Sequence, residues 1–140
     1  MSDTPTVTRQ LVEGEDRMLV VEKRFGIHFP FMIEPMIYSV AQKMTRDVYQ
    51  GGYWLFYQLS NDGFYMAPDS DQIYQVFCDN CWDGQLSSDA LGIVCCLYAY
   101  SHLSFSRDHI FGKVCADHYH RLREYMFGHA EVAAILGATD

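Results

Sequence analysis

The stretch YQGGYWLFYQLSNDGFYMAP, residues 49–68, decides the fold of this chain. Seven of its twenty residues are aromatic, and Asn61-Asp62-Gly63 separates two apolar runs. Asn, Asp and Gly adopt positive φ angles most easily, as a tight turn between two strands requires. The stretch therefore predicts a β-hairpin with strands at 53–60 and 63–67. Pro68 closes it, because proline cannot donate a hydrogen bond to a neighbouring strand.

Both faces of the first predicted strand are apolar. Side chains alternate between the two faces of a strand, so one face carries Tyr53, Leu55, Tyr57 and Leu59 and the other carries Trp54 and Phe56. Either helices cover both faces, or one face is an exposed partner site. We expect helices to cover both, because the remainder of the chain predicts several helices.

Apolar periodicity and capping residues predict five helices outside the hairpin. They span residues 15–24, from about Pro35 to the Gly51-Gly52 pair, 88–102, 106–127 and 130–136. A strand at 72–78 is expected to continue the hairpin as a third antiparallel neighbour. The order of elements predicts an α+β fold, a small antiparallel sheet of about three strands packed with about five helices.

Particular residues are expected to mark the ends of these helices or to form their buried sides. Met18, Val21 and Phe25 form the predicted buried stripe of the first helix, and Val48 ends that of the second. The third and fourth helices are expected to begin after the capping residues Ser87 and Ser106, and the last to stop at Gly137. In the fourth, the buried side is expected to include Ile110, Val114, His118 or Tyr119, Leu122 and Met126.

The length of 140 residues suits one domain with one core, and 49% of the residues are hydrophobic. We expect a flexible leader at residues 1–13 and a single domain at 14–140. No apolar run approaches the roughly 18 residues needed to cross a bilayer, and the N-terminus lacks the apolar stretch of a signal peptide. Without an export signal the five cysteines are expected to stay reduced. These observations predict a cytoplasmic protein without membrane contact.

The charge is unevenly placed along the chain. The net charge is −8, and residues 47–106 carry seven acids and no Lys or Arg. Binding to DNA needs clustered cations that displace counterions from phosphates, so we expect no direct nucleic-acid binding. The candidate acidic partner surface comprises Asp69, Asp71, Asp79 and Asp83. A weak DNA mimic built on these four acids remains an alternative, although a duplex carries about one charge per 1.7 Å of axis.

A metal-dependent enzyme is a second alternative. Cys78 and Cys81 form a CxxC pair, and His118 and His120 are the downstream residues that could complete a zinc site. Structural zinc sites use four ligands at characteristic spacings, which this set does not show. Neighbouring helical residues point in different directions, so Asp117 is poorly placed to orient His118. We therefore expect no metal, no cofactor and no catalytic residue.

The aromatic stretch resembles the signature of the ArdB/KlcA antirestriction family. The matching residues are Tyr49, Gly51, Gly52, Trp54, Phe56, Tyr57, Gly63, Phe64, Tyr65, Met66, Ala67 and Pro68. A second similar stretch runs from Leu86 to Ile93 and includes Ser87, Asp89 and Gly92; a third is Arg24-Phe25-Gly26. Asn61-Asp62-Gly63 departs from the Asn-Gly-Gly of the family pattern, and the CxxC pair is not a family feature.

The resemblance implies a small non-enzymatic protein encoded on plasmids or other mobile elements. Such proteins protect incoming unmodified DNA from type I restriction–modification systems. The implied partner is a type I restriction complex or an associated host protein. The family is distinct from the highly acidic DNA mimics, and the signature residues are expected to be structural: glycines for turns and Trp54 and Phe56 as core anchors.

Overall fold

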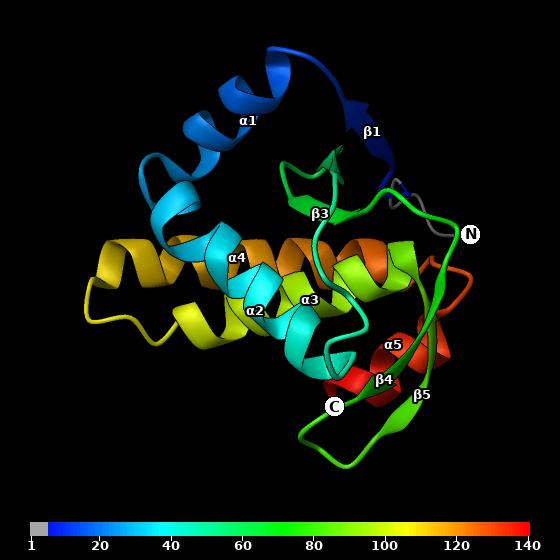
Figure 1. Ribbon diagram of the computed structural model, residues 1–140. Coiled ribbons are helices and arrows are strands. Elements are labelled where there is room, and N and C mark those ends of the chain that lie inside the picture. Colours follow the sequence, from blue (N-terminus) through cyan, green and yellow to red (C-terminus); the bar gives the residue numbers. More distant parts are fainter. Residues whose placement is uncertain (1–5) are drawn as a thin grey trace, which may run out of the picture.

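The computed structural model describes residues 6–140 and shows an α+β fold, as predicted (Figure 1). Within these residues, five α-helices and one π-helical turn accompany two small antiparallel sheets. The elements are β1 (Arg9–Val12), α1 (Asp16–Phe25), η1 (Phe29–Ile33), α2 (Glu34–Met44), β2 (Trp54–Leu59), β3 (Phe64–Pro68), β4 (Ile73–Phe77), β5 (Asp83–Ser87), α3 (Ser88–Leu103), α4 (His109–Met126) and α5 (Val132–Thr139). None of the helices at residues 6–140 has the combination of length and apolar character that spanning a bilayer demands.

The predicted hairpin is present as β2 and β3. The two strands pair antiparallel, with Tyr57 opposite Tyr65. In the turn, Asp62 rather than Gly63 adopts the left-handed conformation, at φ 70°. The Asn61 side-chain oxygen accepts a hydrogen bond from the Gly63 N–H at 3.0 Å, a common way for asparagine to stabilise a turn.

The expectation of a flexible leader is wrong for its C-terminal part. Arg9–Val12 forms β1, which pairs antiparallel with β2 and makes it the central strand of the first sheet. Its sequence, RQLV, lacks the alternating apolar pattern that predicts a strand, and three of its four residues are exposed. The strand forms because the edge of β2 offers unpaired backbone N–H and C=O groups with which it can pair. Residues 1–5 of the expected leader lie outside the described residues.

The predicted third strand exists as β4, but it does not extend the hairpin. It pairs with β5, a strand that the sequence pattern does not indicate, and the two form a separate sheet. Only Leu86 of β5 is buried, so its hydrophobic signal is weak. In Figure 1 this second hairpin lies beside α5, on the other side of α3 and α4 from the first sheet.

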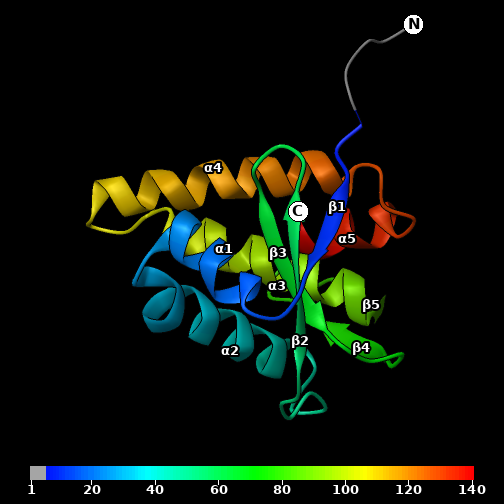
Figure 2. The ribbon, with the colours of Figure 1, turned by 90° about the horizontal axis from the view of Figure 1, so that it is seen from above.

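Helix α3 is the centre of the molecule. It contacts α2, α4, α5 and β3, and twelve of its residues are buried, as its apolar character all round predicts. Ser87 caps it as expected, because the Ser87 hydroxyl accepts a hydrogen bond from the Ala90 N–H. Gly92 allows close approach to β3: a Cβ there would lie 2.4 Å from the Met66 carbonyl oxygen. Figure 2 shows the first sheet lying across α3.

The first two helices differ in detail from the prediction. Val21 and Phe25 of α1 are buried, whereas Met18 is 66% exposed. Helix α2 ends at Met44, well before the Gly51-Gly52 pair, and Val48 is exposed. Its buried residues are Ile37, Ala41 and Met44. The π-helical turn η1 precedes it and changes the direction of the chain between α1 and α2.

The ends of the last two helices also differ from the prediction. Asp108, rather than Ser106, caps α4, and its carboxylate accepts from the N–H groups of Ile110 and Phe111. This shift leaves Ile110 exposed and buries Phe111. Gly137 lies inside α5 instead of ending it. A Cβ at this position would lie 2.4 Å from the Trp82 indole nitrogen, so a side chain would not fit there. The glycine therefore allows close contact between α5 and the β4–β5 hairpin.

Other elements cover both faces of the hairpin, as expected. On one side the Phe56 and Phe64 rings pack edge-on against Phe29 at 5.7 and 5.9 Å. On the other side the Tyr65 ring stacks on Tyr125 of α4 at 5.6 Å. Trp54 is 2% exposed. The aromatic stretch is therefore mainly core.

Candidate functional site

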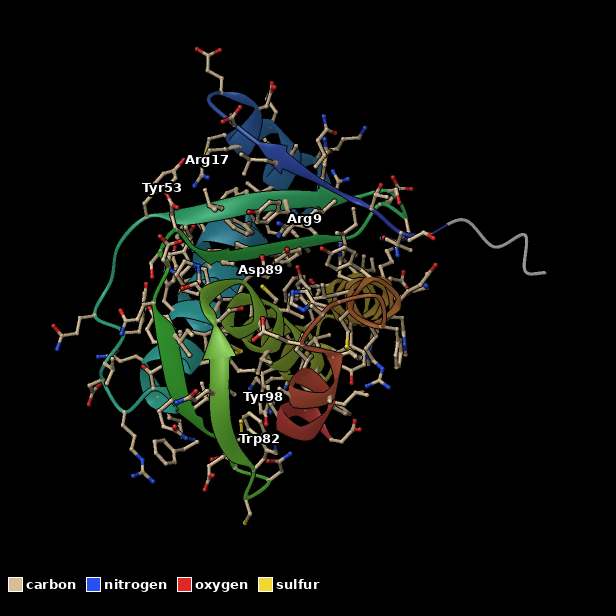
Figure 3. All side chains as sticks on the ribbon, turned by 90° about the vertical axis from the view of Figure 1, so that its right-hand side faces the viewer. Arg9, Arg17, Tyr53, Trp82, Asp89 and Tyr98 are labelled. Atoms are coloured by element: carbon tan, nitrogen blue, oxygen red, sulfur yellow. The ribbon has the colours of Figure 1, made fainter. Side chains whose placement is uncertain are left out.

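The carboxylate of Asp89, at the start of α3, collects three polar side chains from distant parts of the chain. The Arg9 guanidinium and the Tyr65 hydroxyl donate to Asp89 Oδ1 at 2.7 and 2.8 Å. The His129 Nε2 lies 2.8 Å from Asp89 Oδ2. Figure 3 shows Arg9 and Asp89 at the junction of the first sheet and α3. We call Arg9, Tyr65, Asp89 and His129 the Asp89 cluster.

The tautomer of His129 follows from its two hydrogen bonds. Its Nδ1 accepts from the Glu131 N–H at 3.0 Å, so the proton of the neutral ring is on Nε2 and is donated to Asp89. Glu131 in turn accepts the N–H and the hydroxyl of Ser87. The connection between α4 and α5 is thereby joined to the N-terminus of α3.

The cluster keeps Asp89 ionised. Burial alone would raise the pKa of Asp89, but hydrogen bonds from His129 and Tyr65 and the charge of Arg9 hold it below its usual value. Burial and the adjacent Asp89 charge raise the pKa of Tyr65 far above its ordinary value. A tyrosine that resists ionisation is a poor base or nucleophile at neutral pH. The arrangement suits a fixed polar cross-link better than proton transfer.

Aromatic rings surround this cluster. The Arg9 guanidinium lies 4.3 Å from the centroid of the Tyr57 ring, in cation–π geometry. Tyr57 stacks on Tyr65 at 5.0 Å, and the stack continues to Tyr125. The signature residues Tyr57, Tyr65 and Asp89 thus meet in space, across the first sheet and two helices.

A second group of signature residues forms the buried start of β2. The Trp54 indole N–H donates to the Tyr49 hydroxyl at 2.8 Å, and both side chains are buried. Gly51 and Gly52, between them, have φ angles of 116° and 127°, which L-residues with a side chain rarely adopt. These glycines let the chain double back so that Tyr49 reaches Trp54.

The residues of the metal alternative occupy different environments. Cys78 and Cys81 lie in the turn between β4 and β5, and both thiols are free. His118 is buried beside Phe25, with the ring centroids 4.5 Å apart, and His120 is exposed. Across residues 6–140, no three His, Cys, Asp or Glu side chains are grouped so that they could hold a metal ion.

The four acids of the candidate partner surface are all exposed and lie around the second sheet. Asp69 and Asp71 lie between β3 and β4, while Asp79 and Asp83 lie in and after the β4–β5 turn. Asp79 forms a surface ion pair with Lys43 at 3.3 Å. None of the four is buried.

Sequence reasoning missed Arg9, His129 and Glu131. Arg9 belongs to the segment expected to be a leader, and the two others lie in an irregular connection between helices. None belongs to a recognisable motif, and the helix predicted at 130–136 includes Glu131 without giving it a role. They share partners only because the fold brings together β1, β3, α3 and the α4–α5 connection.

Comparison with known proteins gives consistent matches. A sequence profile of the family described as antirestriction protein matches residues 47–140. The antirestriction protein KlcA of Escherichia coli is 37% identical over 139 residues, covering 96% of this chain and 95% of KlcA. YafX of E. coli strain K12 is 41% identical over 112 residues, or 78% of this chain and 71% of YafX.

A solved structure is also similar, with a TM-score of 0.90 and 34% identity. The match covers 100% of this chain and 99% of that one. The structure is described as that of the KlcA and ArdB proteins, which show a novel fold and antirestriction activity against type I DNA restriction systems in vivo but not in vitro.

Proposed function

This chain belongs to the antirestriction protein family, and from that premise we propose that it protects incoming unmodified DNA against type I restriction–modification systems. The observation that carries the proposal is the near-complete structural match to proteins described as active against those systems. The match spans the whole chain, so this protein shares the fold of those proteins.

We propose that protection works through contact with a protein, without catalysis, in the cytoplasm. The solved relatives are described as active in vivo but not in vitro. That difference favours a component present in cells, such as a host protein associated with the restriction complex. The absence of a poised nucleophile in the Asp89 cluster also supports a role in binding.

The contact surface that we favour is an apolar cleft of about 360 Å³ between α1 and η1. Met18 and Ile27 line it and are 66% and 67% exposed. Exposed apolar surface of this kind marks protein contact sites. Glu22 and Glu34 also line the cleft, and none of its lining residues is basic. The complementary partner would be the restriction complex or its associated protein, presenting apolar side chains beside Lys or Arg.

The proposal is tested by phage plating. Unmodified phage is plated on a type I-restricting host with and without the expressed protein, and phage already modified by that host serves as the control. We expect the protein to raise the plating efficiency of unmodified phage alone. Unchanged plating at an expression level verified by immunoblot would refute the proposed function.

The cleft is tested by Ile27→Asp, with Ile110→Asp as its matched control. Both isoleucines are exposed, but Ile110 lies on α4 outside the cleft. We expect Ile27→Asp to abolish protection while the protein remains folded, and Ile110→Asp to retain it. Full protection by folded Ile27→Asp would rule out this surface and leave the antirestriction proposal intact.

The acidic surface remains the alternative contact site. As a weak DNA mimic, the protein would use the carboxylates of Asp69, Asp71, Asp79 and Asp83 in place of phosphates. Their joint replacement by Asn would then abolish protection in a folded protein. Retained protection by that variant would eliminate mimicry through these residues.

A further inference from the structure

A second cleft, distinct from the Asp89 cluster, lies where three elements meet. It has a volume of about 400 Å³ and is lined by Lys23, Arg24, Asp62, Val114, Asp117, His118 and Arg121. These residues come from the end of α1, the β2–β3 turn and the middle of α4. The cleft thus gathers three cationic side chains in a protein of net charge −8.

The donors in this cleft lack acceptors. Within residues 6–140, neither Arg24 nor Arg121 forms a side-chain hydrogen bond or an ion pair. Both side chains are half-buried, and the Arg24 Nε is buried without a hydrogen-bond partner in the described part of the chain. A buried N–H without an acceptor is costly, and the other guanidinium nitrogens of Arg24 and Arg121 are not among the buried atoms that lack a partner. These remaining donors are free to bind an acceptor that enters the cleft.

His118 adds an independent observation. It is 2% exposed, lines the cleft, and its Nδ1 has no hydrogen-bond partner among the described residues. Buried polar side-chain atoms nearly always have a partner in proteins. An orphaned ring nitrogen beside two unpaired guanidiniums points to a missing polar ligand rather than to a defect of packing.

The two carboxylates of the cleft do not supply the missing acceptor. Asp117 is held by Lys113, one turn away on α4, at 3.1 Å, and Asp62 forms no ion pair with a residue of the described chain. Burial, Arg121 and Arg24 together lower the pKa of His118 to about 4, against the opposing effect of Asp117 and Asp62. The cations therefore dominate the field at the buried ring.

We propose that this cleft binds a compact phosphate anion, either inorganic phosphate or a phosphate monoester. Guanidinium groups present forked donors that match phosphate oxygens. A volume of about 400 Å³ accommodates a small ligand. The overall negative charge disfavours a polyanion such as duplex DNA. The site goes beyond the antirestriction activity and does not depend on it.

Binding is measured by following the His118 ring signals in proton–carbon NMR spectra while phosphate is added at constant ionic strength. We expect a saturable shift with phosphate and none with chloride. Adenosine 5′-monophosphate should bind as well, and adenosine should not. Tighter binding of the nucleotide than of inorganic phosphate would identify the ligand as an ester, and the reverse order would identify the free anion.

Variants test which residues form the site. Arg24→Gln and Arg121→Gln should each weaken phosphate binding by at least about tenfold, because a charge-assisted hydrogen bond is lost. Arg107→Gln is the matched control, since Arg107 is an exposed arginine outside the cleft, and it should bind like the parent protein. No saturable shift in the parent protein, an equal response to chloride or adenosine, or unchanged binding by both folded cleft variants would overturn the proposal.

Discussion

The carboxylate of Asp89 shows how much a single residue can organise. It lies in the first turn of α3, where the helix dipole favours a negative charge. From there it accepts hydrogen bonds from Arg9 of β1, Tyr65 of β3 and His129 beyond α4. An acid in the first turn of a helix thus becomes the meeting point of four segments.

Asp89→Asn should make the protein less stable and change its response to acid. The pKa of Asp89 is lowered in the folded state, while an unfolded aspartate titrates near about 3.9. The carboxylate therefore stabilises the fold above about pH 4, and this contribution is lost as the pH falls further. We expect the substitution to cost about 1–3 kcal/mol at pH 7.

Urea unfolding of Asp89→Asn and the parent protein from pH 7 to pH 2 measures this effect. The stability difference between them should shrink as the pH falls below about 4. Asp71→Asn is the matched control, because Asp71 is exposed, and it should unfold like the parent at pH 7. A constant difference between Asp89→Asn and the parent at every pH would contradict the assigned role of the charge.

Trp54→Ala should destabilise the fold by about 3–5 kcal/mol, since it empties a buried aromatic site. Trp54 also donates the hydrogen bond that holds Tyr49. Phe105→Ala serves as the control: Phe105 is 86% exposed and its loss should cost less than about 0.5 kcal/mol. Normal thermal stability of Trp54→Ala with lost protection would instead place Trp54 at a partner site.

At the scale of elements, β1 depends on contacts outside its own sequence. It is short, mostly exposed and at the edge of its sheet. Besides its pairing with β2, it is held by the Arg9 side chain, which contacts Tyr57, Tyr65 and Asp89. One arginine therefore joins an otherwise weak strand to the core.

Arg9→Ala should loosen β1 without unfolding the domain. Removing the guanidinium takes away the ion pair with Asp89 and the stacking on Tyr57. Amide hydrogen exchange should become faster at residues 9–12 and 56–59, which pair in the register Arg9 to Leu59 through Val12 to Phe56. Gln10→Ala, which removes an exposed hydrogen bond to Gln58, should change this exchange much less. Equal exchange in the two variants would refute the role of Arg9.

At the scale of the whole molecule, the helices form a scaffold around α3 and the sheets lie on two sides of it (Figures 1 and 2). The second sheet is tied to α5 through packing of Trp82 on Gly137 and a hydrogen bond from the Asn80 side chain to the Gly137 carbonyl. Figure 3 shows Trp82 and Tyr98 beside α5. The proposed contact cleft and phosphate cleft lie on the sides of α1 and α4, away from this second sheet.

Removal of divalent metals should leave the fold unchanged. The described residues contain no grouping of three ligand side chains suited to a metal, and a structural zinc ion would contribute directly to stability. Dialysis against EDTA should therefore not lower the melting temperature, and elemental analysis should find no stoichiometric zinc. If dialysis lowered the melting temperature and added zinc restored it, the result would support the alternative of a metal-dependent enzyme. Its ligands would be Cys78, Cys81, His118 and His120.

Local patterns determined much of this protein. The β2–β3 hairpin, the Ser87 cap and the apolar helix α3 could be predicted because their signals lie within a few residues of one another. The same aromatic stretch identified the family. Much of this stretch is buried: Trp54, Phe64, Tyr65 and Met66 fill the core.

Only the tertiary structure decided the rest. β1 and β5 have almost no hydrophobic pattern and form because a neighbouring strand offers unpaired backbone groups. Arg9, Asp89 and His129 lie up to 120 positions apart in the chain. Lys23 and Arg24 of the phosphate cleft are likewise far in sequence from His118 in α4. The sequence by itself determined local conformation and family through short-range patterns. The polar cluster and the clefts depend on which distant segments the packing of the core brings together.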